Sequence, residues 1–235
     1  MASARYITPS GPQAEYEPGS HGRVLRNRLG IRRAGEMAEA EYAALLEIRL
    51  KYMNRVAADT RFTAALVCQM HRDWLGGIYE WAGCYRSVEI QKGDFRWPPA
   101  YFVAQNMQRL EEGALRRSTP CRSGSISHVA QQVAEVHAEL LLIHPFREGN
   151  GRLARWLADV MVLQAGLRIP HYGFTGRGSR ARRQRYLEAV RQATWGNMSY
   201  WRLSLRKQST GPWHHAESSL PREGPRRRTS PACWP

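Results

Sequence analysis

Apolar residues recur at steps of three and four along most of the chain, a spacing that predicts amphipathic helices. The pattern is clearest over 126–143, where one valine, isoleucine or leucine falls on the same face in nearly every turn. Further stretches of this kind predict helices over 36–58, 62–75, 101–114, 151–166, 180–193 and 197–207. Because helical periodicity accounts for nearly every long segment, we expect an all-α fold.

One segment departs from this pattern and predicts a β-hairpin. Residues 87–90 and 95–97 alternate on either side of the tetrad Gln91-Lys-Gly-Asp94, and a glycine-containing turn between alternating runs is typical of paired strands. Pro98 and Pro99 end the hairpin, since proline cannot donate to a strand ladder. The expected architecture is therefore a helical bundle with one hairpin.

The two ends of the chain differ in composition from its centre. Residues 1–22 contain several prolines and glycines and few apolar residues, so we expect a flexible leader. Residues 23–207 carry the helical patterns and are expected to form one domain, since a chain of this length buries one core well. Residues 208–235 are rich in serine, proline and arginine, and we expect this basic tail to be disordered.

Composition indicates a soluble globular protein. The chain is 43% apolar and 23% charged, and no segment approaches the roughly 20 apolar residues of a membrane span. The N-terminus lacks the apolar core of a secretory signal, so we expect a cytoplasmic protein, with export as an effector left open. The four cysteines include no Cys-x-x-Cys pair, so neither a zinc site nor a disulfide framework is expected.

The net charge of +15 raises the question of a nucleic-acid partner. Arginine supplies nearly all of this positive charge and is spread over several segments. This pattern indicates a compositional bias of the genome as much as a binding surface. We therefore do not expect nucleic acid as the partner. A basic nucleic-acid-binding module stays as an alternative, and its candidate contacts are Arg177, Arg180, Arg182, Arg183 and Arg185.

The break between two of the predicted helices carries the strongest chemical signal. Pro145 ends the first helix near His144, because a residue before proline avoids helical geometry. The start of the next helix offers unpaired N–H groups and a partial positive charge, which together bind anions. Gly149 and Gly151 permit backbone turns that aim successive N–H groups at one point, and Asn150 adds an amide donor. The turn can therefore form a nest for phosphate oxygens.

Charged side chains surround this turn. Arg152 and Arg155 are three residues apart on one face of the new helix and can hold further phosphates. Glu148 suits a magnesium ion that arrives with a nucleotide, because magnesium takes one or two carboxylates and fills its other positions with water and phosphate. His144 can be neutral at pH 7 and accept a proton from a hydroxyl. A base, a metal ligand and a phosphate nest together indicate phosphoryl or nucleotidyl transfer.

The segment from His144 to Arg155 resembles the signature of the Fic family, His-x-Phe-x-(Asp/Glu)-Gly-Asn-Gly-Arg-x-x-Arg, and matches every defined position. The upstream stretch from Tyr79 to Arg86, with the hairpin after it, is similar to the family's approach to its flap. The similarity covers about residues 36–205. The resemblance implies a Fic-type helical bundle and a protein adenylyltransferase, which transfers AMP from ATP to a hydroxyl of another protein.

The resemblance also implies a role for each residue of the loop. His144 would activate a Ser, Thr or Tyr hydroxyl of the target protein, and Glu148 would hold Mg²⁺ against the α- and β-phosphates. The ATP contacts would be the backbone of Gly149, Asn150 and Gly151, the Asn150 side chain at the α-phosphate, Arg152 at the β-phosphate and Arg155 at the γ-phosphate. Phe146 is interpreted as a structural anchor of the loop. The products would be AMP-modified protein and pyrophosphate.

The hairpin would act as a flap that aligns the target. Its first strand would pair with an extended target segment and bring one hydroxyl near His144, and a purely structural hairpin is the alternative. The strand residues concerned are Ser87, Val88, Glu89 and Ile90. Lys92 at the tip would reach the nucleotide or the target. No spacing of residues in the sequence identifies the adenine pocket. Tyr186 is a candidate for it, and packing in the core is the alternative role for this residue.

Variation within the family leaves alternatives. Relatives with lysine in place of the second glycine act as kinases, and Gly151 argues against that activity; transfer of UMP or phosphocholine stays open. A degenerate, purely structural Fic domain is a further alternative, which the intact loop argues against.

Many family members are restrained by a motif, (Ser/Thr)-x-x-x-Glu-(Gly/Asn), on the same chain or on an antitoxin. Ser219 and Glu223 match this motif literally, but Pro221 opposes the helix that the motif normally occupies. We therefore interpret the match as coincidence. An inhibitory antitoxin-like protein is then a partner to consider.

Overall fold

The structure is a computed structural model, and it describes residues 12–193 except 94, 123 and 175. The α-helices in this part of the chain are α1 (Ala34–Arg55), α2 (Ala64–Leu75), α3 (Val103–Leu110), α4 (Arg116–Ser118), α5 (Ile126–Ile143), α6 (Asn150–Gln164) and α7 (Ser179–Ala193). Short 3₁₀ turns form η1 (Pro12–Ala14) and η2 (Ala100–Phe102), and a π-helical turn forms η3 (Glu111–Leu115). The hairpin consists of β1 (Gln91–Lys92) and β2 (Phe95–Arg96).

Polar caps explain where two of the central helices begin. The Ser125 hydroxyl accepts a hydrogen bond from the backbone N of His128 at 3.2 Å before α5, and Thr63 caps Leu66 N at 3.1 Å before α2. The stretch predicted as helical over 101–114 is helical in the structure, and its turns change from 3₁₀ to α and then to π along the chain. The helix predicted over 197–207 lies outside the described residues. Within the described residues, none of the helices has the length and apolar character that crossing a membrane requires.

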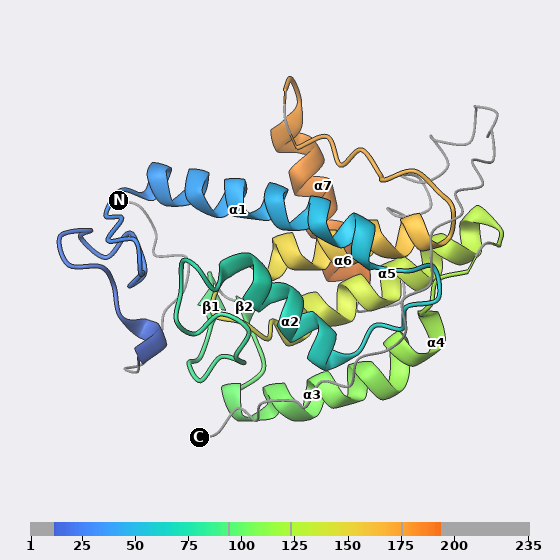
Figure 1. Ribbon diagram of the computed structural model, residues 1–235, viewed down its shortest axis with the longest axis horizontal. Coiled ribbons are helices and arrows are strands. Elements are labelled where there is room, and N and C mark those ends of the chain that lie inside the picture. The colour runs from blue at the N-terminus through green and yellow to red at the C-terminus, as the bar shows by residue number, and fades with distance from the viewer. Residues whose placement is uncertain (1–11, 94, 123, 175, 194–235) are drawn as a thin grey trace.

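Helix α5 lies at the centre of the bundle. It packs along α6 and α3 and also contacts α7, while α1 packs against α2. Figure 1 shows α1 along one edge and α3 along the opposite edge, with α5 and α6 between them. Buried residues of α5 and α6, such as Val133, Leu140 and Leu157, belong to one hydrophobic core. The expectation of an all-α bundle with one hairpin is confirmed.

The hairpin is shorter than predicted and lies further along the chain. Its strands pair antiparallel, with Gln91 opposite Arg96 and Lys92 opposite Phe95. The prediction of a strand over 87–90 was wrong: Val88 and Ile90 are buried, and although Ile90 O accepts a hydrogen bond from Trp97 N at 3.1 Å, the paired strands begin at Gln91. The pairing extends into the predicted turn because Gly93, with φ of 58°, allows a two-residue connection.

Part of the segment expected to be a flexible leader lies against the domain. Tyr16 forms a β-bridge with Leu25, and Gln13 is buried. The Gln13 side chain donates to Tyr85 O at 3.3 Å and accepts from Ser87 N at 3.0 Å. Two hydrogen bonds from one side chain attach a segment that has few apolar residues, which hydrophobic patterning does not reveal. The rest of the leader and the basic tail over 208–235 lie outside the described residues.

Candidate active site

A sharp backbone turn at the junction of α5 and α6 positions the predicted base. His144 follows α5 and adopts a left-handed conformation, with φ of 50° and ψ of 61°. Non-glycine residues rarely adopt this conformation, so the surroundings must hold it. The buried guanidinium of Arg86 donates from Nε to His144 O at 2.8 Å, and Arg86 N donates to Pro145 O at 2.8 Å. Arg86 therefore anchors the turn at two successive carbonyls.

One hydrogen bond and one aromatic contact orient the imidazole of His144. Its Nδ1 lies 3.1 Å from Leu141 O, and because a carbonyl only accepts, Nδ1 carries the proton and Nε2 carries the lone pair. The ring packs against Trp97, which follows the hairpin, with 4.1 Å between centroids. Burial lowers the pKa of His144 to about 3, and the positive charges of Arg86 and Lys92 act in the same direction. At pH 7 the ring is neutral and carries a proton-accepting nitrogen.

Helix α2 supports the loop through His71. The ring of His71 stacks on the buried ring of Phe146, with 3.9 Å between centroids. Its Nδ1 accepts from Gly83 N at 2.8 Å, so Nε2 carries the proton and donates to Glu148 O at 3.1 Å. Burial lowers the pKa of His71 to about 4, which keeps this one-donor, one-acceptor form at pH 7. The sequence gives no sign of this support, because all its partners are distant along the chain.

Asn150 closes the loop onto itself. Its Nδ2 donates to Phe146 O at 2.7 Å, and its Oδ1 accepts from Phe146 N at 2.9 Å. The resemblance to the Fic family implied that this side chain lies at the α-phosphate, and in the structure it is buried and hydrogen-bonded within the loop. The reason is the tight turn itself, which brings the backbone of Phe146 within reach of an amide four residues later.

The N-terminus of α6 presents donors that suit an anion. Arg152 N and Leu153 N both donate to Gly149 O, at 3.0 and 2.9 Å. The N–H groups of Asn150 and Gly151 come before the first N–H that has an acceptor within the helix, so the helix itself cannot satisfy them. Together with the helix dipole they form an anion-binding position.

The ring of Trp74 leaves no room for a side chain at position 149, which must therefore be glycine. This residue has φ of 84°, and a Cβ on it would lie 2.9 Å from Cζ3 of Trp74. Both the backbone conformation and the close indole ring therefore exclude a side chain. The turn into α6 is set as much by α2 as by the loop's own residues.

The first arginine of α6 is held by a carboxylate from a distant helix. Arg152 Nη2 lies 2.7 Å from Glu41 Oε2 of α1 and 3.6 Å from Glu148 Oε1. Its guanidinium also lies over the ring of Trp74, 4.8 Å from the centroid. The side chains of Arg152 and Glu148 are 25% and 21% exposed, so both reach the surface at the start of α6.

The second arginine is held by aromatic rings. The guanidinium of Arg155 lies 5.4 Å from the ring of Phe174 and 5.8 Å from that of Tyr186. A Cβ on Gly151 would lie 3.6 Å from Arg155 Nη1, which places this guanidinium beside the loop. Tyr186 is buried, and its hydroxyl lies 2.9 Å from His137 Nε2. These contacts and its packing against Arg155 explain the presence of a tyrosine here without a nucleotide.

The four residues expected to align the target are buried or hydrogen-bonded within the domain. Val88 and Ile90 lie in the interior, and Glu89 Oε1 accepts a backbone N–H of η2 at 2.9 Å. Ser87 N donates to Gln13 Oε1 at 3.0 Å. The exposed edges of the hairpin are those of β1 and β2, one step further along the chain.

Lys92 and Arg147 complete the surroundings of the loop. Lys92 is exposed on β1, and its charge acts on His144, which places the two in electrostatic contact. Arg147 occupies an undefined position of the motif and is buried, with Nε donating to Gln13 O at 2.7 Å. Gln13 therefore connects the loop to the segment that leads into the hairpin.

The arginines of the alternative basic module have partly structural roles. Arg182 donates from Nε to Gly173 O at 2.6 Å and from Nη2 to Arg177 O at 2.8 Å. Arg183 lies over the ring of Phe174, 5.7 Å from the centroid. These contacts account for some of the charge of α7 without a nucleic acid.

Glu148 is the candidate metal ligand at this site. Within the described residues, no group of three or more His, Cys, Asp or Glu side chains could hold a metal ion. A single carboxylate beside an anion-binding helix end fits magnesium, which is usually bound by one or two carboxylates together with substrate phosphates.

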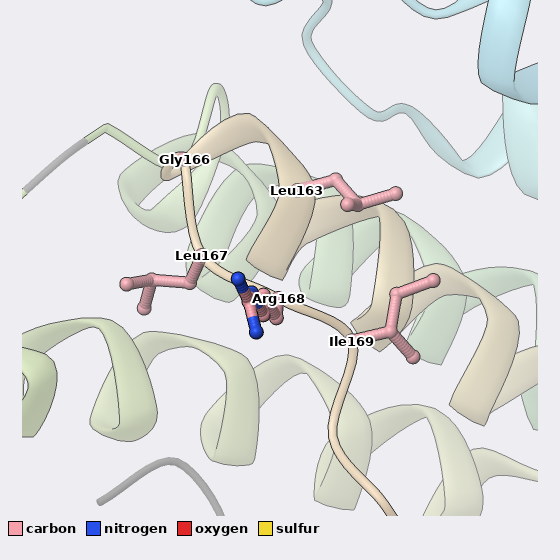
Figure 2. A pocket seen from close by; sticks show the side chains of 5 residues that line it. All are labelled: Leu163, Gly166, Leu167, Arg168 and Ile169. Atoms are coloured by element: carbon pink, nitrogen blue, oxygen red, sulfur yellow. The ribbon is translucent and has the colours of Figure 1, made fainter. Parts of the chain in front are cut away.

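A surface hollow lies at the opposite end of α6. It is lined by Leu163, Gly166, Leu167, Arg168 and Ile169. Figure 2 shows Leu163 and Ile169 on one side and Leu167 on the other. Because α6 has 15 residues, the hollow is on the order of 20 Å from the loop. It has no part in the chemistry proposed below.

Comparisons with known proteins identify the family to which this chain belongs. Residues 61–162 match the Fic/DOC family, a range that runs from the start of α2 through the loop to the end of α6. The "Probable protein adenylyltransferase Fic" of Salmonella typhimurium is 30% identical over 162 residues, which cover 64% of this chain and 73% of that protein. This chain belongs to the Fic/DOC family.

Further relatives show how much of the Fic fold the chain contains. The "Protein adenylyltransferase VbhT" of Bartonella schoenbuchensis is 26% identical over 206 residues, which cover 88% of this chain but 40% of VbhT. The crystal structure of the Bartonella tribocorum effector protein BepC, with bound AMPPNP, has a TM-score of 0.63 at 21% identity and covers 83% of this chain and 96% of that one. The latter likeness shows a shared fold, and the Fic resemblance of the motif is confirmed.

Proposed function

We propose that this chain is a protein adenylyltransferase, which transfers AMP from ATP to a Ser, Thr or Tyr hydroxyl of a target protein. The junction of α5 and α6 carries the proposal, because it combines a neutral imidazole with a proton-accepting Nε2 and a helix N-terminus in one buried loop. Membership of the Fic/DOC family supports it, and the Salmonella and Bartonella relatives are named protein adenylyltransferases.

In the proposed reaction, Nε2 of His144 accepts the proton of the target hydroxyl. The hydroxyl oxygen forms a bond to the α-phosphorus, the bond from that phosphorus to the oxygen bridging to the β-phosphate breaks, and pyrophosphate leaves. A pKa of about 3 is low for this role, but a bound polyphosphate raises it, since nearby negative charge favours the imidazolium. The hydrogen bond from Nδ1 to Leu141 O keeps Nε2 as the accepting atom.

The start of α6 binds the polyphosphate in this proposal. The N–H groups of Asn150 and Gly151 face phosphate oxygens, Arg152 contacts the β-phosphate and Arg155 the γ-phosphate. Mg²⁺, with Glu148 as its protein ligand, would neutralise phosphate charge when bound. The side chain of Asn150 keeps the loop closed, so its contribution to nucleotide binding is indirect.

The hairpin aligns the target segment in this proposal. The exposed edges of β1 and β2 offer main-chain groups to an extended peptide, and such pairing tolerates many sequences. Trp97 joins the end of the hairpin to the imidazole of His144, so a peptide paired there lies near the base. Lys92 would contact the nucleotide or the target from the exposed face of β1.

The decisive experiment uses ATP labelled at the α-phosphate or at the γ-phosphate, with magnesium and a cell extract as the source of targets. We expect label from the α-phosphate on protein, its loss in His144→Ala, and its retention in His128→Ala, an exposed histidine of the same helix. Label that comes from the γ-phosphate would instead indicate that the chain is a kinase. Salt-sensitive nucleic-acid binding without any labelling would favour the basic module.

Regulation and location complete the proposal. The motif match at Ser219 and Glu223 lies outside the described residues. Because Pro221 opposes the helix that the motif normally occupies, restraint by a separate antitoxin-like protein is the form we propose. The Bartonella tribocorum neighbour is described as a translocated effector, and export of this chain as an effector is the corresponding proposal. Mass spectrometry for added AMP, in cells with active or His144→Ala protein, identifies the targets.

A further inference from the structure

Glu41 lies outside the segment that matches the Fic/DOC family, yet its side chain reaches the active-site arginine. The match begins at residue 61, whereas Glu41 is part of α1. Its Oε2 lies 2.7 Å from Arg152 Nη2, and its Oε1 accepts a hydrogen bond from the Tyr79 hydroxyl at 2.7 Å. The Glu41 side chain is 8% exposed, so this carboxylate is directed inward and both of its oxygens are bonded.

A second contact fixes the backbone of Glu41. Trp74 Nε1 donates to Glu41 O at 2.9 Å, and the same indole ring lies under the guanidinium of Arg152. Burial, and then the charge of Glu41, raise the pKa of Tyr79, so its hydroxyl stays protonated and remains the donor. Helices α1 and α2 therefore hold Arg152 between a carboxylate and an aromatic face.

The geometry leaves Arg152 suited to bind a phosphate. Guanidinium has five N–H donors, and both carboxylate contacts of Arg152 use Nη2. The two carboxylates compete for that nitrogen, with Glu41 at 2.7 Å and Glu148 at 3.6 Å. Because the nearer carboxylate belongs to α1, the ion pair of Arg152 with Glu148 is the longer of the two.

We propose that Glu41 is a positioning residue that holds Arg152 for the β-phosphate and keeps Glu148 available for magnesium. The inference rests on the proposed function, since it assigns a role within nucleotide binding. It makes α1 a functional part of the site, although α1 precedes the matched segment. Without the Glu41 carboxylate, the ion pair between Arg152 and Glu148 tightens from 3.6 Å, which withdraws a phosphate ligand and a metal ligand together.

The test compares two ligands that differ in the β-phosphate. Binding of magnesium with α,β-methylene ATP, which cannot transfer AMP, and binding of AMP are measured by calorimetry for the full chain and for Glu41→Gln. We expect Glu41→Gln to weaken binding of the triphosphate about tenfold, the effect of losing one charge-assisted contact, and to leave AMP binding unchanged. Glu39→Gln, an exposed residue of the same helix, serves as the matched control and should bind both ligands like the unmodified chain.

The outcomes separate this inference from the proposed function. Equal weakening of both ligands in Glu41→Gln indicates a general structural defect and overturns the positioning role, as does unchanged binding of both. Failure of the unmodified chain to bind the triphosphate overturns the proposed function instead. Where Glu41→Gln folds poorly, Tyr79→Phe removes only the hydrogen bond to Oε1 and should weaken triphosphate binding in the same selective way, by a smaller factor. In an Arg152→Ala chain, Glu41→Gln should then have no further effect on triphosphate binding.

Discussion

The loop between α5 and α6 and the hairpin beside it contribute to one site, yet they are built differently. Residues 144–147, 149 and 150 are buried, and α2, Arg86 and the loop's own amide hold them. The strands of the hairpin have two residues each, and Phe95 is 42% exposed. Figure 1 shows both at the same end of the bundle.

This difference follows from what each region must do. Proton transfer and phosphate binding require atoms at fixed positions, which a densely bonded loop provides. Pairing with a target segment requires an open edge that tolerates different side chains. We therefore expect changes in the loop to affect folding and chemistry together, and changes in the hairpin to affect target use alone.

The largest effect on stability should come from Gly149, and Gly93, which also has a positive φ, provides the comparison. Gly149→Ala should lower the free energy of unfolding by about 2–5 kcal/mol, because strain at φ of 84° adds to overlap with Trp74. Gly93→Ala in the hairpin meets no atom within 4 Å and should lose about 1 kcal/mol from strain alone. Urea denaturation measures both, and equal losses would refute the contrast between the regions.

Asn150→Ala should have the next largest effect. It leaves the buried N–H and C=O of Phe146 without their partners, and this should lower the free energy of unfolding by about 2–4 kcal/mol. In the hairpin, Gln91→Ala removes a hydrogen bond to Gly93 O in an exposed position and should lose less than about 0.5 kcal/mol. Thermal unfolding of the two variants provides the measurement, and a stable Asn150→Ala chain would mean that the loop closes by other contacts.

Acid should weaken the support of the loop through His71. Its pKa is about 4 in the folded chain against 6.5 for the unfolded form, so the unfolded state binds more protons between these values. Stability contributed by neutral His71 is present above pH 6.5 and is lost as the pH falls toward 4. His71→Gln keeps a donor and an acceptor but does not titrate.

The two chains should therefore differ in pH dependence. Between pH 6.5 and 5, the free energy of unfolding of the unmodified chain should fall by about 1–2 kcal/mol more than that of His71→Gln. Urea denaturation across this range tests it. Parallel pH profiles would show that protonation of His71 does not open the loop.

The smallest effect on stability should come from Phe95→Ala. The ring is partly exposed and packs edge-on against Trp97, with 4.9 Å between centroids, so its loss should change the free energy of unfolding by less than about 1 kcal/mol. Labelling of a target protein should nevertheless fall several-fold, with binding of the triphosphate analogue unchanged. Unchanged labelling would assign the hairpin a purely structural role.

Local sequence predicted the helices and the break between them well. The stripe over 126–143 coincides with α5, because period and capping are properties of neighbouring residues. Pro145 and the glycines of the loop marked the turn for the same reason. The hairpin register was missed, since alternation shows that strands pair but the length of the turn decides which residues face each other.

The contacts that orient the site were not readable from the sequence. Glu41, His71, Trp74 and Gln13 act on residues far away along the chain, and no spacing rule connects them. Tyr186 was a candidate for the adenine pocket or for core packing, and the structure places it among buried residues beside Arg155. Asn150 was expected at the α-phosphate, and its closure of the loop depends on the turn that brings the backbone of Phe146 within its reach.

The sequence by itself determined the order of the helices, the place where they break and the chemical groups gathered there, since these depend on neighbours in the chain. Tertiary structure alone decided the tautomer of His144, the carboxylate that binds Arg152 and the ring that excludes a side chain at Gly149. Each of these depends on which surfaces meet when α1, α2 and α6 pack, and packing joins residues that share no local pattern.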